Sequence, residues 1–228
     1  MALLTTPAPV GLLLSGGLDS SILLGYLLRQ GRRVQPFYVR TEVAWQREEL
    51  RTVRKFCAAL ASPRLEELVE LELPLADLYE GHWSVTGEGV PDVASSDDAV
   101  YLPGRNALLA IKAAVWCQLH GIEQLALGVL GSNPFADAGD EFFFYFESAL
   151  NCGAGRRVRI VRPFAHLGKE QVMALGWGMP LEATFSCISP ADGLHCGRCN
   201  KCGERMEAFR LAGREDPTRY APFTPVAN

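Results

Sequence analysis

VGLLLSGGLDSSILLGYLL, residues 10–28, carries one apolar run into a short polar turn and a second apolar run out of it. Val10–Leu14 has the length and hydrophobicity of a buried strand, and Ser20–Gln30 has the spacing of a helix that ends at Gly31. The turn between them combines two glycines, two serines and an aspartate. The stretch therefore predicts a strand-to-helix joint that brings backbone N–H groups close to a ligand.

Phosphate is the ligand that suits this turn. A helix N-terminus presents unpaired N–H groups and the positive end of the helix dipole, and adjacent glycines let the backbone approach phosphate oxygens closely. Ser15 and Ser20 add hydroxyl donors, whereas Asp19 has the wrong charge for an anion unless it caps the helix or recruits Mg²⁺. The chain contains no Walker A motif and no dinucleotide fingerprint. A turn that needs only glycine and a serine cap is the simpler alternative.

Strand-like and helical segments alternate along the rest of the chain. We expect strands at 34–39, 68–73, 124–129 and 158–164, and helices at 45–60, 105–120 and 169–175. The apolar segment 141–150 fits either a helix or a fully buried strand. Residues 80–100, rich in Gly, Ser and Asp, are expected to form a loop over an active site. The alternation predicts an α/β fold with a doubly wound parallel sheet.

The composition is typical of a globular protein and argues against secreted, membrane-spanning and strongly basic nucleic-acid-binding proteins. The 228 residues are 48% hydrophobic and carry a net charge of −4, which fits an ordinary globular core and gives no general attraction to nucleic acid. The N-terminus lacks the basic region of a signal peptide, and no apolar stretch is long enough to span a bilayer. A cytoplasmic protein is the expectation. In that compartment seven cysteines indicate thiols or a metal site rather than disulfides.

Four of those cysteines have the spacing of a metal site. Cys187, Cys196, Cys199 and Cys202 read Cys-x8-Cys-x2-Cys-x2-Cys, which suits the tetrahedral preference of Zn²⁺. A closed set of four thiolates predicts a structural zinc. An iron–sulfur cluster, four unconnected or redox-active thiols, and His195 as a rival fourth ligand are the alternatives.

The composition changes beyond Thr184 to cysteine, glycine and charged residues. This change predicts two units, a nucleotide-binding domain over 1–184 and a small zinc-binding element over 185–228. Cys57, Cys117 and Cys152 lie outside the four-cysteine pattern and are expected to be buried thiols rather than ligands.

Ser-Gly-Gly-x-Asp-Ser after the first strand resembles the PP-loop of the N-type ATP pyrophosphatases. Those enzymes cleave ATP between the α- and β-phosphates and activate an oxygen or carboxylate as an adenylate. YLPGRNALL at 101–109, HLGKEQVMALG at 166–176 and the cysteine-bearing stretch 184–213 extend the resemblance. Together these stretches are similar to the 7-cyano-7-deazaguanine synthases of queuosine-precursor biosynthesis.

The resemblance implies an ATP-dependent ligase, in which 7-carboxy-7-deazaguanine and ammonia give the nitrile through an adenylate and an amide, releasing AMP and pyrophosphate. It also implies a structural zinc and a homodimer. Asp19, Arg105 and Lys169 correspond to catalytic positions, and Asp137 to a residue that faces the deazapurine; the alternatives are a solvated helix-end arginine and a surface lysine. The ATP-binding positions are Leu14, Ser15, Gly16, Gly17, Leu18, Asp19, Ser20 and Ser21.

Two segments depart from the family pattern. Residues 38–49 replace a Gly-Gln-Arg-His-like stretch, and 130–140 are shortened. A related ligase that adenylates a different carboxylate, on a small molecule or a protein terminus, therefore remains an alternative. A PP-loop enzyme that thiolates tRNA would need a cysteine pair near the loop or a basic domain, which the net acidic charge disfavours. A zinc-ribbon interaction protein would leave the PP-loop unexplained.

Overall fold

The computed structural model describes residues 9–222, and one parallel five-stranded sheet forms its centre. The strands are β1 (Val10–Leu13), β2 (Val34–Arg40), β3 (Val69–Glu72), β4 (Gln124–Ala126) and β5 (Arg159–Val161). Their spatial order is β3-β2-β1-β4-β5, so the chain winds outward from β1 first to one side and then to the other. The predicted doubly wound α/β fold is confirmed.

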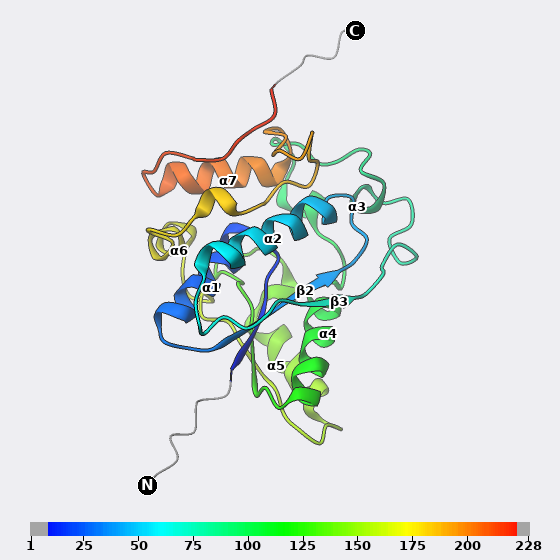
Figure 1. Ribbon diagram of the computed structural model, residues 1–228. Coiled ribbons are helices and arrows are strands. Elements are labelled where there is room, and N and C mark those ends of the chain that lie inside the picture. Colours follow the sequence, from blue (N-terminus) through cyan, green and yellow to red (C-terminus); the bar gives the residue numbers. More distant parts are fainter. Residues whose placement is uncertain (1–8, 223–228) are drawn as a thin grey trace.

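Helices cover both faces of the sheet, as Figure 1 shows. Those with three or more turns are α1 (Leu18–Arg29), α2 (Gln46–Leu60), α4 (Arg105–His120), α5 (Asp140–Asn151) and α7 (Asn200–Leu211). Two are shorter, α3 (Trp83–Thr86) and α6 (Lys169–Leu175). Helices α1 and α2 pack on one face, with α6 and α7 beyond them, and α4 and α5 pack on the other. In the described part of the chain, no helix has the length and apolar character needed to cross a membrane.

The apolar strand sequences supply a core on each face of the sheet. Leu12 in β1 is fully buried against α1 and α2, whereas Phe37 in β2 and Leu125 in β4 are buried against α4 and α5. A parallel sheet covered on both sides needs near-continuous apolar strands rather than alternating ones. This requirement explains the unbroken apolar run that enters the first turn.

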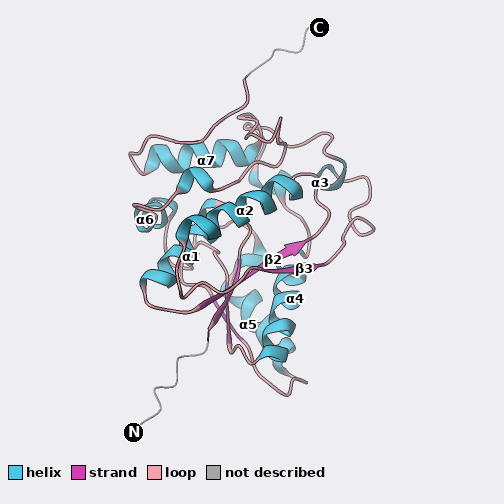
Figure 2. Ribbon diagram, in the orientation of Figure 1, coloured by secondary structure: helices cyan, strands magenta, loops and turns pink. Residues whose placement is uncertain are grey.

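Several boundaries differ from the prediction. Strand β4 ends at Ala126 because the chain turns away to pack Gly128 against the start of α1, where an added Cβ would lie 3.0 Å from the Ser20 backbone. Helix α1 starts two residues early, with Gly17 as an N-cap that makes no side-chain hydrogen bond, so the serine-cap alternative is wrong. Segment 141–150 is helical. The expected loop at 80–100 contains α3 and a 3₁₀ turn but is otherwise irregular, as Figure 2 shows between β3 and α4.

The central strand should be the most sensitive point of the core. We expect Leu12→Ala to lower the free energy of unfolding by about 2–5 kcal/mol, because the side chain is fully buried and leaves a cavity. The matched control is Leu78→Ala in the loop between β3 and α3, whose side chain is 59% exposed; it should change stability by less than about 0.5 kcal/mol. Urea unfolding followed by circular dichroism measures both. Equal effects would contradict the assignment of β1 to the core.

Candidate functional site

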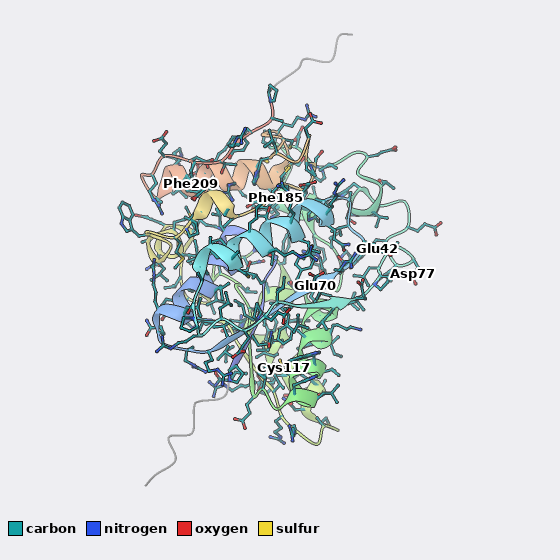
Figure 3. All side chains as sticks on the ribbon, viewed as in Figure 1. Glu42, Glu70, Asp77, Cys117, Phe185 and Phe209 are labelled. Atoms are coloured by element: carbon teal, nitrogen blue, oxygen red, sulfur yellow. The ribbon has the colours of Figure 1, made fainter. Side chains whose placement is uncertain are left out.

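A cavity of about 350 Å³ opens at the carboxyl ends of β1, β2 and β4. It lies where the strand order reverses around β1, which is where open parallel sheets bind ligands. Its walls include the β1–α1 turn, α2, the start of α4 and the C-terminal segment that carries Phe185. Figure 3 shows Phe185 between α2 and α7.

The β1–α1 turn has the shape that its glycines predict. Gly16 has a φ of +82°, which disfavours any side chain, and a Cβ there would lie 2.8 Å from Val53 Cγ2. The Gly16 carbonyl accepts a 2.7 Å hydrogen bond from the Phe185 N–H. The first turn of α1, and with it the positive end of the helix dipole, therefore borders the cavity.

The predicted phosphate-binding residues lie together at this turn. The Ser15 and Ser20 hydroxyl oxygens are 3.1 Å apart, and Ser20 Oγ also accepts the Ser15 N–H. Gly16 and Ser21 do not line the cavity; the Ser21 hydroxyl is buried and has no hydrogen-bond partner among the described residues. The residues of this set that do line it are Leu14, Ser15, Gly17, Leu18, Asp19 and Ser20.

Asp19 and Lys169 form an ion pair at the edge of the cavity. Lys169 Nζ, at the start of α6, lies 2.7 Å from each carboxylate oxygen of Asp19. Asp19 is the second residue of α1, so the interpretation of Asp19 as a helix cap is wrong. The pair joins two residues far apart in the sequence and places a cation beside the phosphate-binding turn.

Arg105 is the first residue of α4 and also lines the cavity. Its Nε is buried and has no hydrogen-bond partner within residues 9–222. Buried donors normally have a partner, and a guanidinium is suited to phosphate or carboxylate oxygens. The side chain is thus not a solvated helix-end arginine, and its unpartnered donor suits an anionic ligand.

Asp137 does not line the cavity directly, in contrast to the expectation that it faces the substrate. It is 8% exposed and is not one of the cavity-lining residues, whereas its partner Asn106 is. Asn106 Nδ2 donates to Asp137 Oδ1 at 3.0 Å and to the Asp137 carbonyl at 3.2 Å. Asp137, which the sequence predicts to face the substrate, is therefore separated from the cavity by the Asn106 side chain.

Glu49 is a cavity residue to which no motif pointed. It is 9% exposed and accepts a 2.7 Å hydrogen bond from the Tyr38 hydroxyl. Burial raises the pKa of Glu49, and the nearby Arg105 guanidinium opposes that rise. Burial, and then the Glu49 carboxylate, raise the pKa of Tyr38.

Helical spacing is the signal that could have revealed Glu49. Glu49, Val53 and Phe56 follow the i, i+4, i+7 pattern of a buried stripe, and all three are buried. The adjacent Glu48 instead pairs with Arg51, whose guanidinium also binds the Gly193 carbonyl, and it does not line the cavity.

Arg205 on α7 is a second residue that the sequence analysis missed. It is 1% exposed, yet it lines the cavity. Within the described residues its guanidinium bonds only neutral oxygens, those of Thr184, Ser186, Leu181 and Thr218. These bonds fix the C-terminal segment against the cavity wall.

The four cysteines of the C-terminal pattern converge. Their Sγ atoms all lie within 4.8 Å of one another, and all four side chains are buried. Two Sγ–Sγ distances are 3.9 Å, too long for a disulfide and close to the edge of about 3.8 Å that four sulfurs 2.3 Å from a tetrahedral zinc would have. The N–H groups of Cys196 and Cys199 donate to cysteine sulfurs, as in thiolate metal sites. The cluster fits a zinc ion.

His195 does not belong to this cluster. Its Nε2 accepts the Ser186 N–H at 3.1 Å, its ring packs on Phe185, and burial lowers its pKa to about 3. The ring therefore packs against Phe185 and accepts a hydrogen bond from Ser186, two residues that line the cavity.

The remaining cysteines are also separate from the cluster. Burial raises the pKa of Cys57 to about 11 and that of Cys117 to about 12. Cys117 lies on α4, away from Phe185 in Figure 3. Cys152 is exposed, so the expectation of a buried thiol is wrong there; it follows the last turn of α5 next to a surface glycine.

Comparison with known proteins adds to this geometry. The family model "Queuosine biosynthesis protein QueC" matches residues 10–213. Proteins named 7-cyano-7-deazaguanine synthase are similar over most of both chains: 32% identity with that of Solidesulfovibrio magneticus (96% of this chain, 99% of the relative), and 33% with that of Novosphingobium aromaticivorans (94% and 97%). A 4-thiouridine synthetase solved with RNA and ATP has 15% identity and a TM-score of 0.48 (90% of this chain, 50% of that one), a likeness too low to assign function.

The cysteine cluster predicts about one zinc ion per purified chain. Cys199→Ser should lose most of that metal and lower the thermal midpoint, because structural zinc contributes on the order of 10 kcal/mol in zinc-finger peptides. Cys152→Ser, at an exposed thiol, is the matched control and should keep both. Elemental analysis and thermal melts measure them. A wild-type protein purified anaerobically without bound metal would contradict the prediction.

Proposed function

Since the chain belongs to the queuosine biosynthesis protein QueC family, we propose that it is an ATP-dependent enzyme that converts 7-carboxy-7-deazaguanine to 7-cyano-7-deazaguanine. The observation that carries the proposal is the family match over residues 10–213, which includes both the phosphate-binding turn and the cysteine cluster. Two relatives with this activity in their name match over almost their whole length. Membership in the family decides against the tRNA-thiolating and zinc-ribbon interpretations.

We propose that the nitrogen comes from ammonia and that the products are AMP and pyrophosphate. The turn after β1 has no Walker lysine to hold a transferred γ-phosphate, which supports pyrophosphate as the leaving group. The carboxylate is first activated as an adenylate, ammonia then forms the amide, and a second ATP activates the amide oxygen before the nitrile forms. This makes the enzyme a carbon–nitrogen ligase.

The cavity residues suit the first activation. We propose that residues 14–21 form the ATP-binding turn, in which the cavity-lining members face the phosphates at the start of α1 and Gly16 and Ser21 shape the turn. Lys169 and Arg105 supply positive charge where negative charge builds up on the phosphates as pyrophosphate leaves. Asp19 holds Lys169 in place, and its carboxylate oxygens are the kind of ligand that Mg²⁺ accepts. We propose Asp19, Arg105 and Lys169 as the catalytic residues.

Asp137 is proposed to read the deazapurine. Its carboxylate is an acceptor, and the ring N–H and exocyclic amine of a guanine-like edge are both donors. In this structure the carboxylate accepts a hydrogen bond from Asn106, which lines the cavity, so Asp137 lies behind that side chain and the deazapurine would have to take the place of Asn106.

A second candidate function is adenylation of a different carboxylic acid. Both segments that depart from the family pattern, 38–49 and 130–140, reach the cavity. They contribute Tyr38, Val39, Trp45, Glu49 and Asn133 to its lining. Pyrophosphate exchange across a set of carboxylic acids separates the two candidates.

The remaining proposals concern the metal, the domains, the oligomer and the compartment. We propose one structural Zn²⁺ per chain, and two units at 1–184 and 185–228. Exposed apolar side chains on α4 and α5 support a homodimer; they are Ile111, Val115, Leu119, Phe144 and Tyr145. A cluster of unpaired thiols suits the reducing cytoplasm.

The reaction is tested by its products. With 7-carboxy-7-deazaguanine, ammonium chloride and ATP, we expect AMP and pyrophosphate by chromatography, and ATP–pyrophosphate exchange without ammonium. Asp19→Ala should abolish exchange without a loss of stability, because an ion pair about a quarter exposed contributes about 0–1 kcal/mol. Glu207→Ala, which removes an exposed carboxylate paired with Arg210, is the control. ADP as the main product would contradict the proposal.

The acceptor assignment has its own test. Asp137→Ala leaves donors of the deazapurine unpaired, which costs about 1–3 kcal/mol and corresponds to roughly a ten- to hundredfold higher KM for that substrate. The KM for ATP should change little. Asp140→Ala, at a largely exposed side chain three residues away, is the matched control. An unchanged KM for the deazapurine in Asp137→Ala would contradict the assignment.

A further inference from the structure

Three carboxylates line the cavity, and they differ in their partners. Asp19 and Glu204 each bind a lysine Nζ, at 2.7 Å and 2.5 Å. Glu49 instead accepts its hydrogen bond from the Tyr38 hydroxyl, and among residues 9–222 no basic side chain forms an ion pair with it. The cavity therefore contains one buried carboxylate whose charge is not neutralised by direct contact with a cation.

The position of Glu49 brings it next to the phosphate-binding turn. Its Cγ lies 3.7 Å from the place that a Cβ of Gly16 would occupy. The Trp45 side chain, from the residue before α2, lines the same cavity and is 4% exposed. A carboxylate, a phenol oxygen and an indole ring thus meet beside the place where an adenylate would form.

We propose that Glu49 binds the ammonium ion that supplies the nitrogen and accepts one proton from it. The inference rests on the proposed function and names a residue for a step which that function leaves unassigned. Carboxylate and hydroxyl oxygens accept N–H bonds. The Glu49 carboxylate and the Tyr38 hydroxyl oxygen therefore offer acceptors that match the N–H donors of ammonium.

The proposed step transfers the acyl group of the adenylate to ammonia. Ammonium has no free electron pair, so one proton passes to Glu49 and leaves neutral ammonia. The nitrogen electron pair forms the C–N bond to the acyl carbon of the adenylate, and the C–O bond to AMP breaks, its electron pair staying on the phosphate oxygen. The nitrogen adduct releases its surplus proton to water, and Glu49 returns its proton to water before the next turnover.

The charges around Glu49 set its pH dependence. Burial raises its pKa, which brings a carboxyl group closer to the working range of a general base. Arg105 from α4, Tyr38 from β2 and the Trp45 side chain each lower that pKa. The other charged groups lining the cavity are the two ion pairs and Arg205 from α7. Removing the Tyr38 hydroxyl should therefore raise the pKa of Glu49 further.

Glu49→Gln tests the assignment with two nucleophiles. The variant keeps the side-chain size and an oxygen acceptor for Tyr38. We expect kcat/KM for ammonium at neutral pH to fall by on the order of 10²- to 10⁴-fold, the range for a lost general base. Hydroxylamine, a weaker base that is mostly uncharged at neutral pH, needs no such deprotonation, so hydroxamate formation should change little. Glu48→Gln, at the adjacent residue, which pairs with Arg51 and does not line the cavity, is the matched control for both nucleophiles.

Pyrophosphate exchange separates failure of this inference from failure of the proposed function. Exchange needs ATP and the carboxylate but no nitrogen donor, so it should persist in Glu49→Gln and report a folded site. Exchange absent from the wild type would overturn the proposed function. Exchange present in both proteins, with ammonium kinetics unchanged or with hydroxylamine equally impaired, would overturn the role of Glu49 alone.

Tyr38→Phe gives a second test that leaves the carboxylate in place. The ammonium-dependent rate rises with pH as Glu49 loses its proton, and loss of the Tyr38 hydrogen bond should move this rise to higher pH. Exchange measured in parallel reports any separate effect of the variant on adenylation. A pH profile that coincides with that of the wild type would overturn the assignment even if Glu49→Gln did not fold.

Discussion

The backbone at Gly16 is the constraint on which the site depends. Its positive φ turns the chain sharply at the end of the central strand, and the space beside it is already filled by Val53 of α2. Its carbonyl is bound by the Phe185 N–H of the C-terminal segment. One residue without a side chain therefore aligns three parts of the chain: the strand that leads in, the helix packed above it, and the segment leading to the cysteine cluster. A side chain at this position would collide with Val53 of α2 and would strain the backbone at the end of the strand.

The cysteine cluster acts on the cavity through its neighbours in the sequence. Cys187 stands between Ser186 and Ile188, and both of these line the cavity. Arg205, three residues after the last cysteine of the cluster, donates hydrogen bonds to the hydroxyl oxygens of Thr184 and Ser186 in the same segment. A metal held by the four sulfurs would thus set the shape of a cavity that it does not enter.

Local signals made much of the fold predictable. Helices α4 and α6 have the predicted bounds because glycines mark both their starts and their ends. Strand β4 is shorter than predicted because its apolar pattern continues after the chain has left the ladder to pack on α1. At the site, the turn and the cysteines were predictable from spacing. The partners of Asp19 and Glu49 were not, because those contacts join separate elements, and an isolated carboxylate in a sequence carries no sign of what it will face.

The order of the strands places different cavity-lining segments at different positions along the sheet. The turn that we propose binds phosphate follows the central strand β1, whereas the two segments that depart from the family pattern lie at the end of β2 and after β4, on either side of it. Under the proposed function, the acid would be activated beside the central strand, and the two segments on either side would contact the acid. If the two segments contact the acid, changes confined to them would alter which carboxylic acid is activated and leave the turn that binds ATP as it is.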